Sequence, residues 1–377
     1  MLSILKVMLQ LLHILYSLFK LFPTKKKVVF ISRQSDRPSL DMRMLKKEIQ
    51  TSHPDYQIVL LCKKIGERVP EKIGYCFHML RQMYHLSTSQ IAILDSYAIL
   101  VSILHHKKSL LIIQMWHSIG TMKKFGYSIL DMPEGSSSRL AKIMKMHANY
   151  DYILAASDAY KSHLAEGFHY PTDKIVTLPL PRVEALEDPN LAESTRKKIV
   201  SAYPQLTEPG KETILYIPTF RKGEDESFQK AALDLANAVD YSRYHLIIKP
   251  HPLSNFTGSH PHAIIDHLFS SFEMLFVSDC VISDYSCIIY EAAILNRPLY
   301  FYAYDYDHYQ SARDFYIDYR NEMPGPVCTT AEDTLRSISN HACQQEAVRQ
   351  FVSKYVTPQS NHETRDIVDF IFARRKS

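Results

Sequence analysis

Short apolar runs separated by segments with helical spacing recur through the first half of the chain. These runs are residues 27–32, 56–62, 90–95, 109–114, 151–157 and 174–180. Each is rich in aliphatic and β-branched residues and is bounded by polar ones, which is typical of buried strands. Because strands that alternate with helices form parallel βαβ units, this half predicts one Rossmann-like domain over residues 25–181.

The pattern stops in the middle of the chain and then resumes. Residues 182–211 are rich in prolines and acids and predict a linker that contains a short helix. The second series of apolar runs is 212–220, 244–252, 280–286 and 297–305. We therefore expect a second Rossmann-like domain over residues 212–343. Residues 344–377 read as a helical segment that could pack back across the two halves.

The first 24 residues differ from the rest because they are almost continuously apolar. Six polar side chains interrupt the run every three or four positions: Ser3, Lys6, Gln10, His13, Ser17 and Lys20. On a helix this spacing gives one narrow polar stripe and a wide apolar face. Lys25 to Lys27 follow directly, and lysines favour anionic headgroups. We expect an amphipathic helix in the membrane interface, with a spanning helix or a helix docked on its own protein as the alternatives.

Composition, net charge and cysteine spacing exclude few classes of function. The chain has 377 residues, 46% of them hydrophobic and 22% charged, as in a folded protein of two domains. A net charge of +4 gives no reason to expect a nucleic-acid partner. The six cysteines lie far apart with no CxxC pair, which favours reduced thiols over disulfides or a zinc site.

Polar side chains capable of chemistry follow the ends of four predicted strands. His117 follows the run that ends at Gln114, and His251 follows "LIIK" at residues 246–249. Thr219 and Arg221 follow "ILYIP" at residues 214–218, and residues 284–286, starting with Asp284, follow "CVIS" at residues 280–283. Ligands of open α/β sheets bind at the carboxyl ends of the strands. These residues therefore predict a binding site between two domains that face a cleft.

The residue types at these strand ends suit the transfer of a phosphate group. Neither a GxGxxG fingerprint nor a P-loop is present, so phosphate has to be bound in another way. Ser286 is a candidate N-cap, and Glu291 suits ribose hydroxyls. Lys249 and His251 can offset charge on a phosphate leaving group, and Arg221 is a candidate bidentate phosphate ligand.

His117 is the candidate general base, because an imidazole titrates near working pH and can take a proton from an attacking hydroxyl. We expect no metal centre from the spacing of the histidines. A divalent cation is the one cofactor left open, since Asp305 and Asp307 form a weak DxD-like pair.

Taken together in order, these motifs resemble those of the CDP-glycerol glycerophosphotransferase family, the teichoic acid primases and polymerases. The resemblance covers about residues 90–330 and rests on six stretches: "WHSIGTMKKFG", "ILYIPTFR", "KPHP", "ISDYSCIIYEAAILNRPLYFYAYDYDHY", "RDFYID" and "PGP". It implies a GT-B-like fold and a monotopic enzyme at the cytoplasmic face of the membrane.

The resemblance also implies roles for individual residues. His117 would activate the acceptor hydroxyl, while His251 with Lys249 would bind the pyrophosphate and assist the departure of CMP. The remaining positions implied to contact the donor are Trp116, Ser118, Gly120, Thr121, Arg182, Pro218, Thr219, Ser286, Cys287, Glu291 and Arg313.

Three departures from the family pattern bear on the donor. Trp-His-Gly is Trp-His-Ser here, through Ser118; DYSS is DYSC, through Cys287; and Glu184 stands near the place of an aspartate. None of them removes a proposed catalytic group.

We therefore predict transfer of glycerol phosphate from CDP-glycerol to a hydroxyl of a membrane-linked acceptor, either undecaprenyl-linked or a glycolipid. The alternatives are a CDP-ribitol-dependent enzyme and another GT-B transferase that uses a nucleotide-sugar.

Overall fold

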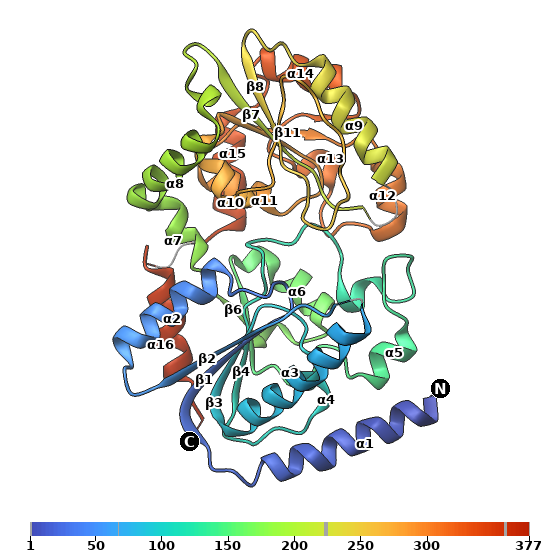
Figure 1. The fold of residues 1–377 in the computed structure, drawn as a ribbon, viewed down its shortest axis with the longest axis vertical. Helices are drawn as coiled ribbons and strands as arrows, with labels where there is room; N and C mark the ends of the chain where they lie inside the picture. Colours follow the sequence, from blue (N-terminus) through green and yellow to red (C-terminus); the bar gives the residue numbers. More distant parts are fainter. Residues whose placement is uncertain (1, 67, 222–224, 358–359, 377) are drawn as a thin grey trace. The chain divides into compact units, whose positions relative to one another are not determined.

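The computed structural model describes residues 2–66, 68–221, 225–357 and 360–376 (Figure 1). The chain forms two compact units. The first comprises Met1–His117, Phe125–Glu184 and Thr357–Ser377, and the second comprises Ser118–Lys124 and Ala185–Val356. Each unit is an α/β structure around its own parallel sheet, so the predicted fold class of two parallel-sheet halves is confirmed.

The first unit contains a six-stranded parallel sheet in the order β2-β1-β3-β4-β5-β6. Its strands are β1 (Lys25–Ser32), β2 (Gln57–Cys62), β3 (Ser89–Leu94), β4 (Leu111–Gln114), β5 (Tyr152–Ala155) and β6 (Ile175–Thr177). Its helices are α1 (Leu2–Phe19), α2 (Leu40–Ser52), α3 (Val69–Thr88), α4 (Ile99–Ile103), α5 (Ser138–Ile143), α6 (Lys161–Phe168) and α16 (Glu363–Ala373). Three 3₁₀ turns are Gly126–Ile129, Asp158–Tyr160 and Thr172–Lys174.

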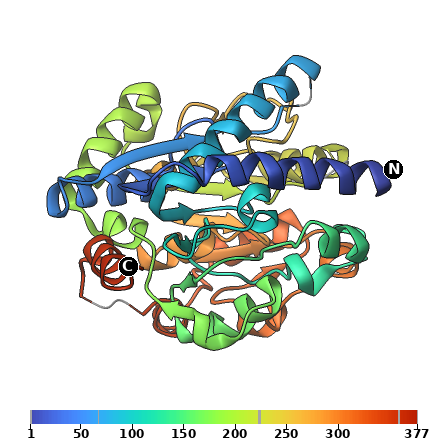
Figure 2. The same ribbon diagram turned by 90° about the horizontal axis from the view of Figure 1, so that it is seen from below.

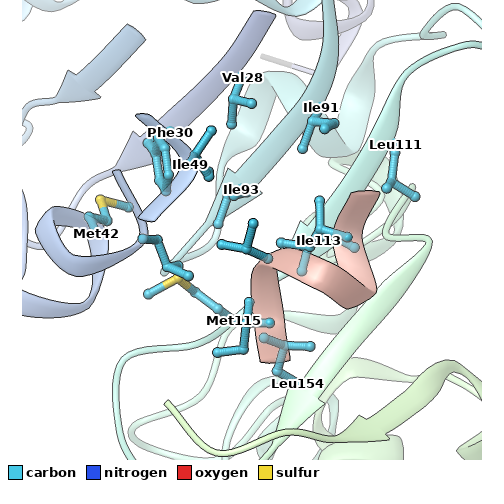
Figure 3. Packing of buried hydrophobic residues seen from close by; sticks show 14 of the residues in the cluster. Val28, Phe30, Met42, Ile49, Ile91, Ile93, Leu111, Ile113, Met115 and Leu154 are labelled. Atoms are coloured by element: carbon cyan, nitrogen blue, oxygen red, sulfur yellow. The ribbon is translucent and has the colours of Figure 1, made fainter. Parts of the chain in front are cut away.

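The core of this unit lies between the sheet and the pair α2 and α16 (Figure 3). Side chains of β1, β3 and β4 alternate toward it, for example Phe30, Ile93 and Ile113. Ser39 caps α2 by accepting the backbone N–H of Met42, and α2 presents its apolar face to the sheet. Close packing of these faces fixes the strand ends from which the polar side chains project.

The second unit contains another six-stranded parallel sheet, in the order β12-β11-β10-β7-β8-β9. Its strands are β7 (Glu212–Ile217), β8 (Tyr244–Ile248), β9 (Ile264–Ile265), β10 (Cys280–Ser283), β11 (Leu299–Tyr302) and β12 (Val327–Cys328). Its helices are α8 (Pro189–Ala202), α9 (Asp225–Ala238), α10 (Ser271–Met274), α11 (Ile288–Ile294), α12 (Tyr306–Arg313), α13 (Tyr319–Glu322), α14 (Ala331–Ser339) and α15 (Gln345–Tyr355). Two 3₁₀ turns are Pro204–Thr207 and Leu275–Val277.

The two compact units divide residues 182–211 and residues 344–377 at other places than the boundaries that the sequence suggests. The expected linker contains α7 (Arg182–Glu187) and α8, and it belongs to the second unit from Ala185 onward. The expected C-terminal segment is shared, because α15 packs on α11 in the second unit while α16 packs on α2 in the first.

Helix α1 lies on the surface of the first unit, where it packs on α3 (Figures 1 and 2). Its contacts include the Tyr16 hydroxyl, 2.8 Å from Nδ1 of His106, and the ring of His13, stacked on His105. The opposite side of α1 is apolar and exposed, with Leu11 60%, Ile14 62% and Leu18 57% accessible. No helix among the described residues is both long enough and apolar enough to cross a membrane.

Candidate active site

The first group of candidate residues surrounds His117 at the carboxyl ends of β1, β3 and β4. Nδ1 of His117 lies 2.9 Å from the backbone carbonyl oxygen of Asp95, which follows β3. A carbonyl can only accept, so Nδ1 must carry the proton, and the lone pair of the neutral ring is on Nε2. This tautomer is the one that a general base acting through Nε2 requires.

The backbone on either side of His117 is held in an uncommon conformation. Trp116 has φ +63°, in the left-handed region that large side chains rarely adopt. The side chain of Gln114 accepts the Trp116 N–H at 2.9 Å, and the indole packs against Phe125 and Phe168. Strain of this kind persists where surrounding contacts over-determine it, and here those contacts fix where the His117 ring lies.

Asp95 and Gln34, which no sequence motif marked as site residues, complete this group. Asp95 is buried, and that burial raises the pKa of its carboxyl to about 6. Gln34, in the loop after β1, places its side-chain nitrogen 3.3 Å from Nδ1 of His117. The position of Asp95 at the end of a predicted strand was a usable signal, whereas nothing in the pattern around Gln34 marked it.

Arg182 lies in the first unit and is held by a buried carboxylate. Its guanidinium forms an ion pair with Asp41 of α2, and its backbone N–H donates to the same side chain at 2.9 Å. Asp41 is fully buried. Glu184 accepts the backbone N–H and hydroxyl of Thr364, at the start of α16. Both side chains therefore make contacts that hold the first unit together, and a donor contact by Arg182 stays a prediction.

The second group of candidate residues lies in the second unit around the ends of β7 and β10. Both carboxylate oxygens of Asp284 accept the backbone N–H of Thr219, at 2.9 and 3.1 Å. The hydroxyl oxygens of Thr219 and Thr121 are buried and have no hydrogen-bond partner among the described residues. A buried hydroxyl without a partner is costly unless a ligand or water satisfies it, so each of the two is a candidate ligand contact.

The guanidinium of Arg221 forms hydrogen bonds with other residues of the protein. It donates to Asp284 at 2.8 Å, to Asp305 at 2.8 Å and to the carbonyl of Thr219 at 2.8 Å. Burial lowers its pKa, but the two carboxylates outweigh this and raise it, so the side chain stays charged. The geometry favours a structural role for Arg221, in which it holds Asp284 and Asp305, over the bidentate phosphate contact that the sequence suggested.

Lys249 and His251 follow β8 on one loop. Nζ of Lys249 is buried and pairs with Asp266 at 3.0 Å. His251 is exposed, and its Nδ1 accepts the backbone N–H of Leu253 at 3.2 Å. An N–H can only donate, so the proton of the neutral His251 ring is on Nε2. His251 thus presents a donor, which is the form that can neutralise a phosphate oxygen.

The segment Ser118–Lys124 follows His117 and is part of the second unit. Lys123 forms a bridge with Phe315, the Tyr316 N–H donates to the Met122 carbonyl at 2.8 Å, and Nζ of Lys124 pairs with Asp314 at 2.7 Å. Nε of Arg313 donates to the carbonyl of Lys124 at 3.1 Å. Arg313 and residues 122–124 are therefore brought together by one short antiparallel contact.

The segment Ser286–Glu291 differs in detail from the expectation. Cys287, and not Ser286, is the residue before α11, and its side chain makes no capping hydrogen bond. Burial raises the pKa of the Cys287 thiol, so it stays protonated. Glu291 is buried in α11, and Pro218 is buried directly after β7. The backbone carbonyl of Gly120 accepts a hydrogen bond from the Ser118 hydroxyl at 3.0 Å.

The described residues contain no group of three or more His, Cys, Asp or Glu side chains placed to hold a metal ion. The two members of the DxD-like pair have separate partners, because Asp305 binds Arg221 while Asp307 pairs with Arg320.

Comparison with known proteins identifies relatives along nearly the whole chain. Residues 14–373 match the family model described as CDP-Glycerol:Poly(glycerophosphate) glycerophosphotransferase. The chain is 31% identical to a teichoic acid ribitol-phosphate primase of Bacillus spizizenii, over 92% of this chain and 90% of the relative. It is 25% identical to a teichoic acid glycerol-phosphate primase of Bacillus subtilis, over 93% of this chain and 92% of the relative.

The fold also matches a solved structure of the wall teichoic acid polymerase TagF. The TM-score is 0.75 at 20% identity, and the match covers 98% of this chain and 95% of that one. A UDP-GlcNAc 2-epimerase from Neisseria meningitidis gives a TM-score of 0.58 at 13% identity, over 92% and 100% of the two chains. At these identities the likeness extends to the fold alone.

Proposed function

The chain belongs to the CDP-glycerol:poly(glycerophosphate) glycerophosphotransferase family, and we propose that it transfers an alditol phosphate from a CDP-alditol to a hydroxyl of a lipid-linked acceptor. The family assignment, which the motifs predicted, is confirmed by the match over residues 14–373. The chain is thus a member of a family of phosphotransferases, and its relatives include teichoic acid primases and polymerases.

The observation that carries the proposed mechanism is the pair of opposite tautomers at the two histidines. His117 holds its proton on Nδ1 and offers Nε2 as a base, whereas His251 offers Nε2–H as a donor. The acceptor hydroxyl loses its proton to Nε2 of His117 as its oxygen attacks the phosphorus that bears the alditol. The bond from that phosphorus to the bridging oxygen breaks, and CMP leaves with the electron pair while His251 stabilises the developing charge.

Buried hydroxyls in the second unit support donor binding there. Thr219 and Thr121 each keep a hydroxyl without a partner among the described residues, and Asp284 fixes the backbone at Thr219. Lys249, Ser286, Cys287, Glu291 and Arg313 complete the proposed donor site, with roles taken from the family resemblance.

For the alditol itself, ribitol is the first candidate and glycerol is the second. Identity is higher to a ribitol-phosphate primase than to a glycerol-phosphate primase, 31% against 25% over similar coverage. The description of the family model names glycerol, which is also the alditol that the motifs predicted. CMP release from CDP-ribitol and CDP-glycerol, measured side by side with one lipid-linked acceptor, decides between them.

We also propose that the protein is a peripheral enzyme of the cytoplasmic membrane face. The exposed side of α1 carries Leu11, Ile14 and Leu18, while Lys20 near its end donates to the carbonyl of His105. A second apolar stripe, Val69, Ile73 and Phe77, is exposed on α3, the helix on which α1 packs. Exposed apolar residues gathered in this way mark contact with a lipid surface or another protein.

A further inference from the structure

The loop between β1 and α2, residues 33–39, has no role in the mechanism described so far, although it touches the candidate base. We propose that this loop is the acceptor-binding element, in which Gln34 binds a hydroxyl of the acceptor and Arg33 binds a phosphate of the same molecule. The inference rests on the proposed function and names the acceptor side of that same site.

The loop is held in place at the carboxyl end of the sheet, where ligands of parallel sheets bind. The N–H of Arg33 donates to the hydroxyl of Ser96 at 3.0 Å, and its guanidinium donates to the carbonyl of Tyr97 at 3.1 Å. The N–H of Gln34 donates to the hydroxyl of Ser32 at 3.2 Å. The loop is therefore fixed against the turn after β3, the same turn whose Asp95 carbonyl holds His117.

The side chain of Gln34 lies next to His117 but, in this tautomer of the ring, does not form a hydrogen bond with it. Its side-chain nitrogen lies 3.3 Å from Nδ1, but Nδ1 already donates its proton to Asp95 and cannot accept another. The Gln34 side chain is exposed and makes no hydrogen bond with other described residues. An amide that offers both a donor and an acceptor beside the base suits a polyol or sugar hydroxyl next to the attacking one.

Arg33 supplies the charge for a phosphate. Its Nε is buried and has no hydrogen-bond partner among the described residues, while the residue as a whole is partly exposed. A guanidinium with an unused donor is the side chain that best matches phosphate oxygens. Its neighbour in the sequence, Arg37, is exposed and makes no side-chain contact with the described residues, so it offers a control of equal charge.

Gln34 and Arg33 together therefore fit a ligand that carries a hydroxyl and a phosphate within one unit of a chain. An acceptor that ends in an alditol phosphate, or a glycan joined to a lipid by phosphate, has this chemistry. We do not assign this loop to the nucleotide of the donor, because the buried hydroxyls that we propose to bind the donor lie in the second unit.

The kinetic test compares Gln34→Ala, Arg33→Gln and the control Arg37→Gln. We expect the KM for the lipid-linked acceptor to rise about tenfold or more in Arg33→Gln, the usual loss for a charge-assisted contact, and about threefold to tenfold in Gln34→Ala, which loses a neutral hydrogen bond. The affinity for the CDP-alditol, measured by binding, stays as in the unaltered protein. A KM shift no larger than that of Arg37→Gln, or an equal loss of donor affinity, overturns the proposal. Gln34 is exposed, so Gln34→Ala keeps the test valid even where Arg33→Gln fails to fold.

A binding test gives an answer that does not depend on turnover. Trp116 is the single tryptophan of the chain, and the centroid of its ring lies 4.1 Å from that of the His117 ring. Titration with sn-glycerol 3-phosphate, glycerol or inorganic phosphate is followed by tryptophan emission. We expect glycerol 3-phosphate to change the emission at lower concentration than the other two, and Arg33→Gln to need about tenfold more of it. An identical response in Arg33→Gln, or no response to glycerol 3-phosphate, contradicts the proposal. If the protein releases no CMP with any acceptor, the proposed function fails while this titration still decides the role of the loop.

Discussion

Nδ1 of His117 and the backbone carbonyl oxygen of Asp95 lie 2.9 Å apart, and this one contact fixes the tautomer of the candidate base in its neutral form. The carbonyl accepts, so the imidazole keeps its lone pair on Nε2. The side chain of Asp95 is not needed for that contact, but it is buried beside Ser32 and Ser96. The backbone and the carboxyl of Asp95 can therefore be tested separately.

The buried carboxyl of Asp95 predicts a pH dependence of stability. Burial raises its pKa from 3.8 to about 6, so the native state holds this proton at pH values where the unfolded state has lost it. The stabilisation is fully present below pH 3.8 and is lost as the pH rises through about 6. Asp95→Asn removes the titration and keeps the carbonyl. Chemical unfolding should show the variant more stable than the unaltered protein at pH 8, by on the order of 3 kcal/mol at most, and this advantage should vanish near pH 4. A constant difference at both pH values would refute this account.

The buried ion pair between Asp41 and Arg182 predicts a large effect on stability. Asp41→Asn leaves the guanidinium without its anionic partner, which costs about 3–5 kcal/mol of unfolding free energy in comparable buried pairs. The matched control is Asp55→Asn, because Asp55 pairs with Lys26 on the surface at 2.7 Å, and exposed pairs contribute little. Urea unfolding monitored by circular dichroism compares the two. Similar midpoints for both variants would mean that Arg182 does not depend on Asp41.

The contacts of Arg221 predict that its replacement acts first on the second unit and only then on the donor. Arg221→Gln leaves the Asp284 and Asp305 carboxylates without their buried cation, so thermal unfolding should begin at a lower temperature. CDP affinity should fall in parallel, because Asp284 also holds the backbone of Thr219. Loss of CDP affinity with an unchanged melting temperature would instead support the direct phosphate contact that the sequence suggested.

The apolar side of α1 predicts binding to lipid vesicles. Replacing Leu11 and Ile14, both more than half exposed, with glutamate should release the protein from sedimenting phosphatidylglycerol vesicles without unfolding it. Gln10→Glu adds one like charge at an exposed polar position of the same helix and serves as the control. If the double variant sediments like Gln10→Glu, the anchoring surface lies elsewhere.

Much of the fold was predictable because strand-forming runs are local. Every predicted strand corresponds to a strand of the structure, from β1 at Lys25–Ser32 to β11 at Leu299–Tyr302. The two missed strands, β9 and β12, have two residues each, which is too short for any apolar pattern to show. The sequence also placed helices in the last stretch, but it could not show that α15 and α16 join different units.

The candidate site was predictable in its residues and less so in their contacts. The positions of His117, Thr219, Lys249 and His251 follow from strand ends alone. The partner of Arg182 lies 141 residues away at Asp41, and the partners of Arg221 lie 63 and 84 residues away. Pairs so distant leave no local pattern, so a lone arginine after a strand reads equally as a ligand contact or as half of a buried ion pair.

The measurement that tests the central claim most directly is CMP release by the purified protein with CDP-ribitol or CDP-glycerol and a lipid-linked acceptor. The proposed mechanism predicts acceptor-dependent release with at least one donor, lost by a factor of about 100 or more in His117→Ala, with CDP binding nearly unchanged. Release that survives in His117→Ala, or a protein that binds neither CDP-alditol, would contradict it.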